Sequence, residues 1–247
     1  MPATTLYANN GGKPTFNEFI SPIGRVVHCY HDKPQLETDE KSQKPQLDAD
    51  GIQKANFKVT LMWPKSELET TLIPLRTLAA TTRDQAWGAD CANDSWFRLE
   101  SFMRDGDNPE HNTKRREYLM NHVYLNFKAK AIPIVKDGVF QKAYTGAPGL
   151  LGPSNEDLMS LDMYAGAWAR VSGIMFGTEY MGKKFISIRL NNIQKGGGPK
   201  GTGDDERIGG GGRPDAKSQF DPLMAKPDPF GGLGGGLGGG GGSRLIL

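Results

Sequence analysis

Four segments of the chain alternate between apolar and polar residues with a period of two. Between residues 56 and 63 the apolar positions are Phe57, Val59, Leu61 and Trp63, and the positions between them are Lys58, Thr60 and Met62. Because successive side chains of a β-strand point to opposite faces, this spacing predicts strands with one buried face. The same alternation recurs in residues 123–131, 164–172 and 184–191. With the β-branched and aromatic segment 21–32, these patterns predict five main strands.

One segment carries helical signals instead. Ser66, with Glu69 three residues further on, has the pattern of a capping box, and Pro74 fits the first turn of a helix over residues 74–87. Glycines within residues 163–177 indicate bends in the fourth strand. Curved strands with one helical segment and long loops favour a mainly β fold, a five-stranded OB-type barrel.

Glycine dominates the last part of the chain. Residues 196–247 hold 19 of the 33 glycines and 5 of the 16 prolines. Such a segment has too little apolar surface to offset its ordering entropy, so we expect it to be disordered. The sequence therefore predicts an N-terminal arm at 1–20, one folded domain at 21–195 and a Gly/Pro-rich tail at 196–247.

The overall charge and the cysteine content exclude several protein classes. The net charge of +2 is too small for histone-like binding, so any contact with nucleic acid requires a local groove. The two cysteines indicate a reducing compartment without a disulfide framework. No apolar stretch approaches the roughly 20 residues that span a bilayer. We expect a soluble, intracellular protein that makes no contact with a membrane.

The polar faces of the later strands combine aromatic and cationic side chains. Bases stack on aromatic rings while Lys and Arg neutralise phosphates, so this composition indicates a groove for single-stranded nucleic acid. The alternative is an ordinary solvated sheet face with aromatic–lysine pairs, with Trp168 filling the core. The candidate DNA-binding residues are Lys58, Tyr124, Lys128, Lys130, Tyr164, Trp168, Arg170, Lys183, Lys184, Phe185 and Arg189.

Acidic and metal-binding residue types gather in two places. Asp105, Asp107 and Glu110 could hold Mg²⁺ for a nuclease, but the neighbouring Gly and Pro favour a tight turn. His28 and His31 point to opposite faces of a strand, which disfavours a shared zinc ion. The sequence contains neither a GxSxG nor a Walker A motif. We expect no catalytic residue, no metal and no cofactor, and therefore no enzyme.

Five short motifs follow one another along the chain: NFKVTLMWPK (56–65), FMRDGD (102–107), VYLNFKAKAIPIV (123–135), MYAGAWARVSGIMFG (163–177) and IRLNNIQKGG (188–197). Their order over residues 20–196 resembles a bacteriophage single-stranded DNA-binding protein family, long known only as a domain of unknown function. The LNN-I-QK end and the Y-x-G-x-W-x-R strand are its most characteristic parts. The resemblance implies an OB-fold that coats single-stranded DNA without base specificity. It also implies a role in phage replication, recombination or repair, in the cytoplasm of the infected bacterial host.

Single-strand binders of this kind often end in a mobile acidic tail that docks replication partners. This chain ends in Arg244 and three apolar residues instead, and its acidic elements lie further back. We therefore place a docking motif for replication or recombination proteins at 219–230, with the partner-binding residues Phe220, Asp221, Asp228 and Phe230. The alternatives to DNA binding are a virion structural or adaptor protein tethered by its tail, and a metal-dependent nuclease.

Overall fold

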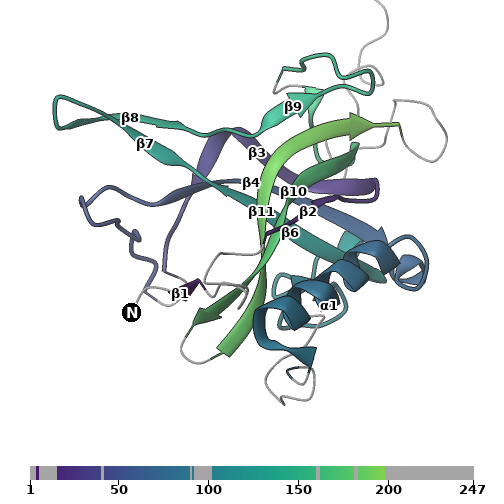
Figure 1. Cartoon of the computed structure of the whole chain (residues 1–247). Coiled ribbons are helices and arrows are strands. Elements are labelled where there is room, and N and C mark those ends of the chain that lie inside the picture. The colour runs from purple at the N-terminus through teal and green to yellow at the C-terminus, as the bar shows by residue number, and fades with distance from the viewer. Residues whose placement is uncertain are drawn as a thin grey trace, which may run out of the picture. The chain divides into compact units, whose positions relative to one another are not determined.

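Five long strands of the computed structural model close into a ring (Figure 1). In order around the ring they are β3 (Gly24–Leu36), β4 (Ala55–Pro64), β6 (His122–Lys130), β11 (Lys183–Gly196) and β10 (Trp168–Tyr180), which returns to β3. Neighbouring strands are antiparallel except β6 and β11, which are parallel. This order and these directions are those of an OB-type Greek-key barrel, so the predicted fold class is confirmed.

The structure describes residues 4–5, 16–39, 42–89, 91, 102–159, 162–180 and 183–197. The chain divides into two units, 1–209 and 210–247, and all described residues belong to the first. The partner-binding residues predicted at 219–230 and nearly all of the predicted tail lie outside the described residues. The domain boundaries expected after residues 20 and 195 stay predictions. Within the described ranges, no helix has the length and apolar character needed to cross a bilayer.

Shorter strands flank the ring. β1 (Thr4–Thr5) and β2 (Asn17–Ile20) pair with β10, β5 (Arg104–Asp105) pairs with β6, and β9 (Gly149–Leu151) pairs with β11. β7 (Ile132–Lys136) and β8 (Val139–Thr145) form a separate hairpin that extends away from the barrel (Figure 1). Its turn residues Asp137 and Gly138 both have positive φ, as a type I′ turn requires. The single strand expected at 122–135 is therefore two strands, because β6 pairs with β4 whereas β7 pairs with β8.

The helical region begins later than its sequence signals suggest. The α-helix α1 (Ile73–Trp87) has Pro74 in its first turn, as predicted, and it buries Leu75 and Ala79. The capping box predicted at Ser66 is wrong, because the 3-10 helix η1 (Lys65–Glu67) occupies this position without a side-chain cap. Glu69 forms an ion pair with Arg76 instead. A second 3-10 helix, η4 (Glu117–Leu119), precedes β6.

The inward faces of the alternating strands fill the barrel. Phe57, Val59, Leu61 and Trp63 are each at most 1% exposed, and burial of such side chains contributes roughly 1.5–3 kcal/mol apiece. The inward set predicted for the last strand also holds, since Ile186 and Leu190 are buried in the same cluster and Ile188 packs against it. The indole of Trp63 lies so close to Gly24 that a Cβ there would meet the ring at 2.6 Å. Only glycine fits this position.

Candidate nucleic-acid interface

The register of the ring aligns four outward side chains in one row. Tyr30 of β3 lies opposite Lys58 of β4, Lys58 opposite Lys128 of β6, and Lys128 beside Arg189 of β11. Adjacent strands are about 4.8 Å apart, so three cations and one aromatic ring follow one another across four strands. We call these four residues the cationic row. It unites Lys58, Lys128 and Arg189, three of the residues predicted to bind DNA.

A second group of side chains lies next to the cationic row. His28 is opposite Thr60, and Thr60 is opposite Asn126, whose Oδ1 accepts a 2.7 Å hydrogen bond from the Thr60 hydroxyl. Trp168 is aligned with Arg25 at the point where β10 meets β3. The Trp168 side chain is partly buried but does not belong to the barrel core, so the alternative that it fills the core is wrong.

β5 and the chain that follows it fold back over this outer face. We call residues 104–119 the cover segment. Its residue Leu119 belongs to a small apolar cluster outside the barrel core, formed by Val27, Met62, Leu119 and Tyr124. The Tyr124 hydroxyl donates a 2.6 Å hydrogen bond to the His111 carbonyl oxygen. Tyr124 therefore lies on the predicted face but is only 6% exposed, and its contact with DNA stays a prediction.

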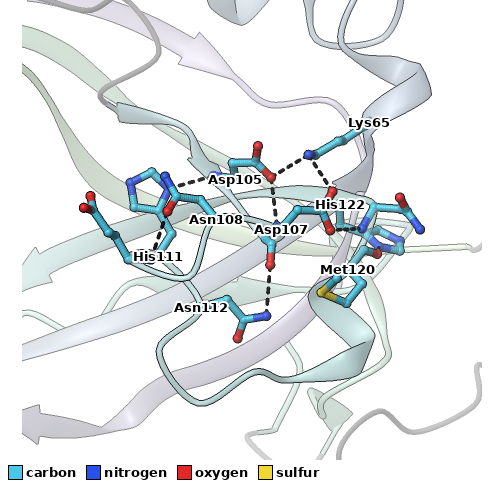
Figure 2. A network of polar contacts seen from close by, with 11 residues as sticks. Lys65, Asp105, Asp107, Asn108, His111, Asn112, Met120 and His122 are labelled. Carbon is cyan, nitrogen blue, oxygen red and sulfur yellow. Dashed lines mark hydrogen bonds and ion pairs between the residues drawn. The ribbon is translucent and has the colours of Figure 1, made fainter.

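Two carboxylates at the start of the cover segment are bound by one lysine (Figure 2). The Lys65 Nζ lies 2.6 Å from Asp105 Oδ1 and 2.6 Å from Asp107 Oδ2. These contacts raise the pKa of Lys65 and, with the Asn121 amide, lower the pKa of Asp107. Asp105 and Asp107, which the nuclease hypothesis assigned to Mg²⁺, therefore stabilise a turn through Lys65. In the part of the chain that the structure describes, no three His, Cys, Asp or Glu side chains are grouped to hold a metal ion.

Asn112 holds the middle of the cover segment together. Its buried amide donates to the Gly106 carbonyl at 2.9 Å and accepts from the Arg116 backbone N–H at 2.8 Å. Gly106 approaches the Leu119 backbone so closely that a Cβ would lie 1.9 Å from its carbonyl oxygen. These contacts give the segment a defined position over the sheet, and they orient the residues around Arg116.

A pocket of about 370 Å³ lies between the cover segment and the sheet. Its lining includes four basic side chains, from β4 and from three places along the cover segment: Lys58, Arg104, Lys114 and Arg116. The other lining residues are Val27, His28, Tyr30, Gln35, Thr60, His111, Asn112, Thr113, Leu119, Tyr124 and Asn126. None of these described lining residues is Asp or Glu, so the pocket presents positive charge without a neutralising carboxylate among them.

The ionisation of two pocket residues reflects this positive charge. Burial, followed by the charges of Lys128, Arg104 and Arg116, lowers the pKa of Lys58 to about 8. Burial and the neighbouring cations lower the pKa of His28 to about 4. His28 is therefore neutral at physiological pH, and its Nε2 accepts a 2.7 Å hydrogen bond from Arg116 Nη1. The pocket is electrostatically arranged for an anion.

Other predicted residues lie at the ends of the ring strands. Lys130 is exposed and lies opposite Asn56 at the end of β6. Arg170 is exposed and its Nε donates to Gln194 Oε1 at 2.7 Å. Tyr164 packs against the barrel core, and the Lys195 Nζ lies 5.4 Å from the centre of its ring.

The remaining predicted residues lie where β10 and β11 extend beside α1. Lys184 is opposite Glu179, and its Nζ lies 5.9 Å from the centre of the Trp87 ring of α1. Phe185 follows on β11 and is 37% exposed. Lys183 begins the strand, but its side chain lies outside the described residues. We call this part the β10–β11 extension, and it does not line the pocket.

Among the lining residues of the pocket, sequence reasoning predicted only Lys58 and Tyr124 as DNA contacts. It missed the aromatic and basic residues His28, Tyr30, Arg104, Lys114 and Arg116. Two of them, His28 and Tyr30, stand two apart within the predicted strand 21–32, so the period-two pattern could have shown their common face. The other three lie in an irregular stretch without periodicity. In that stretch, the basic run Lys114-Arg115-Arg116 was the sequence feature that could have indicated an anion-binding site.

Comparisons with known proteins give one family match. A family model described as "Enterobacter phage Enc34, ssDNA-binding protein" matches residues 43–230. No curated protein matches the chain. Among solved structures, the single-stranded DNA-binding protein from bacteriophage Enc34 in complex with ssDNA is 17% identical, with a TM-score of 0.45 over 78% of this chain and 89% of that chain. The gp2.5 single-stranded DNA-binding protein of bacteriophage T7 is 13% identical, with a TM-score of 0.39 over 79% and 98%.

Proposed function

Because the chain belongs to the family of non-enzymatic single-stranded DNA-binding proteins described from Enterobacter phage Enc34, we propose that it coats single-stranded DNA without base specificity. Its role is then to support phage DNA replication, recombination or repair in the cytoplasm of the infected host. The observation that carries this proposal is the cationic row, which crosses four neighbouring strands on one outer face.

The composition of the row suits a strand of any sequence. Lys58, Lys128 and Arg189 present positive charge to phosphates, which every nucleotide carries. Tyr30 is 39% exposed at one end of the row, where its ring is accessible to a base. Stacking on an aromatic ring discriminates little between bases, because every base has a π-face. Phosphate contact with stacking therefore supports binding without base readout.

Titration of labelled oligo-dT at two or more salt concentrations tests this function directly. Three phosphates neutralised by the cationic row contribute a slope of about −2 in a plot of log affinity against log salt. We expect Lys128→Gln to reduce the magnitude of this slope by about 0.7, and the same change at the exposed Lys142 of the β7–β8 hairpin to leave it unchanged. Failure of the wild-type protein to retain oligo-dT on a filter at low salt would instead favour the virion adaptor alternative.

We place partner docking in the tail, at residues 219–230, where Phe220 and Phe230 lie among Asp221 and Asp228. Removal of residues 197–247 is then expected to leave the affinity for oligo-dT intact or raised, because the cationic row remains complete. The same deletion is expected to abolish capture of a replication or recombination protein from infected cells. A large loss of DNA affinity in the deletion variant would show that the tail itself binds DNA.

A further inference from the structure

Three elements bring positive charge to the pocket beneath the cover segment. Lys58 reaches it from the middle of β4, Arg104 from β5, and Arg116 from the far end of the cover segment. All three side chains line the same pocket, and the charges of Arg104 and Arg116 both act on Lys58. Such convergence of like charges is unfavourable in the absence of an anion.

The neutral side chains of the pocket do not relieve this repulsion. The Thr60 hydroxyl is donated to Asn126, and the amide of Asn112 bonds to the backbone of the cover segment. The neutral ring of His28 accepts from Arg116 Nη1, which leaves the guanidinium's other N–H groups for a further acceptor. Arginine side chains present parallel N–H groups that match two oxygens of a phosphate.

We propose that this pocket takes one phosphate group of the bound strand, held by Arg104, Arg116 and Lys58. The proposal rests on the function proposed above. Binding of DNA without base specificity requires only positive charge along the strand, whereas this proposal gives one phosphate a defined binding site. The pocket adjoins the cationic row through Lys58, which belongs to both, so a strand that follows the row passes its mouth.

The cover segment is a structural part of this subsite. It supplies two of the three proposed phosphate ligands, and it is fixed by the Lys65 ion pairs at one end and by Asn112 in its middle (Figure 2). The backbone that carries Arg104 and Arg116 is thus held in place before a phosphate binds, which lowers the entropy lost on binding.

Binding of a phosphate in the pocket couples DNA binding to the protonation of Lys58. The groups that face Lys58 are Lys128 of β6, Arg104 of β5, Arg116 of the cover segment, and His28 and Tyr30 of β3. In the free protein these surroundings lower the pKa of Lys58 to about 8. A bound phosphate favours the ammonium form, so the complex holds more protons than the free protein and the affinity falls as the pH rises through 8.

The test is the affinity for oligo-dT between about pH 7 and about pH 9 at constant ionic strength, measured by fluorescence anisotropy. For the wild-type protein we expect a fall of about tenfold over this range, because a group with a pKa of about 8 becomes mostly deprotonated. Lys58→Arg is expected to keep binding at about pH 7 and to lose the pH dependence, since arginine stays charged. Lys142→Arg, the same substitution at an exposed lysine of the β7–β8 hairpin, is expected to retain the wild-type profile.

A second arm uses the exposed Arg104, whose replacement does not disturb the core. Arg104→Gln is expected to weaken oligo-dT binding about tenfold, against less than about twofold for Lys142→Gln on the hairpin. Inorganic phosphate is expected to compete with oligo-dT more strongly than sodium chloride of equal ionic strength, and this excess is expected to vanish in Arg104→Gln.

The outcomes separate this inference from the proposed function. A wild-type protein that binds oligo-dT with salt dependence but with a flat pH profile overturns the phosphate subsite alone. The subsite is also overturned if Lys58→Arg keeps the wild-type pH dependence, or if Arg104→Gln and Lys142→Gln behave alike. Absence of binding to oligo-dT at low salt and about pH 7 overturns the proposed function itself.

Discussion

The outer face of β3, β4 and β6, which carries Tyr30, Lys58 and Lys128 of the cationic row, has the same sequence pattern as the β10–β11 extension. The two regions differ in their surroundings. Both alternate apolar core residues with outward aromatic and cationic side chains. On the first face, strand register aligns Lys58 with Lys128, and the cover segment adds Arg104 and Arg116. On the extension, Lys184 lies beside Trp87 of α1 and the next residue, Phe185, is exposed, and neither lines the pocket. We therefore expect outward cations to form a site only where neighbouring strands place them together.

The largest expected effect comes from charge reversal within the cationic row. We expect the double variant Lys128→Glu and Arg189→Glu to lose affinity for oligo-dT on the order of 100-fold at moderate salt, since two phosphate contacts become repulsive. The control is Lys184→Glu, a charge reversal on the β10–β11 extension. We expect it to change the affinity for oligo-dT by less than about threefold. Equal losses for the two would erase the distinction between the regions.

The aromatic residues provide a second comparison. Tyr30→Ala is expected to weaken oligo-dT binding about tenfold, because stacking on an exposed ring contributes roughly 1–3 kcal/mol per base. Phe185→Ala is expected to leave the affinity nearly unchanged, although Phe185 has a similar exposed fraction. Anisotropy titrations of both variants and circular dichroism of the free proteins provide the measurement. If Phe185→Ala proves the more damaging change, DNA follows the extension instead.

The smallest effect is expected from the support of the cover segment. Lys65→Met removes both ion pairs to Asp105 and Asp107, and exposed pairs of this kind stabilise only weakly. We therefore expect about a threefold loss of DNA affinity together with faster amide hydrogen exchange in residues 104–119. Amide exchange in α1 and the extension should not change. Unaltered exchange in the cover segment would show that Asn112 alone suffices to hold it.

The sequence predicted the barrel because strand alternation is local information. Lys58, Lys128 and Arg189 are identifiable as outward residues since each stands between two core residues of its own strand. Their alignment in one row depends on register between strands, which a single sequence does not reveal. The three cations were therefore predictable individually, but the row was not.

The cover segment escaped prediction for a different physical reason. Residues 104–119 have no period, because their fold depends on side-chain-to-backbone hydrogen bonds of Asn112 and on the close approach at Gly106. Alternation correctly assigns Tyr124 to the outer face, yet its burial follows from a segment that lies earlier in the sequence. Local patterns indicate which face a residue belongs to, whereas exposure depends on what covers that face.

One aligned pair, Lys128 with Arg189, joins β6 to β11 and completes the barrel. Two like charges stand side by side there, and adjacent like charges on a sheet repel each other. The free protein therefore carries an unfavourable cross-strand contact between β6 and β11. A polyanion lying across this contact converts the repulsion into attraction to a shared ligand. Bound DNA would then stabilise the closure of the barrel between β6 and β11, where the two strands share a single aligned pair.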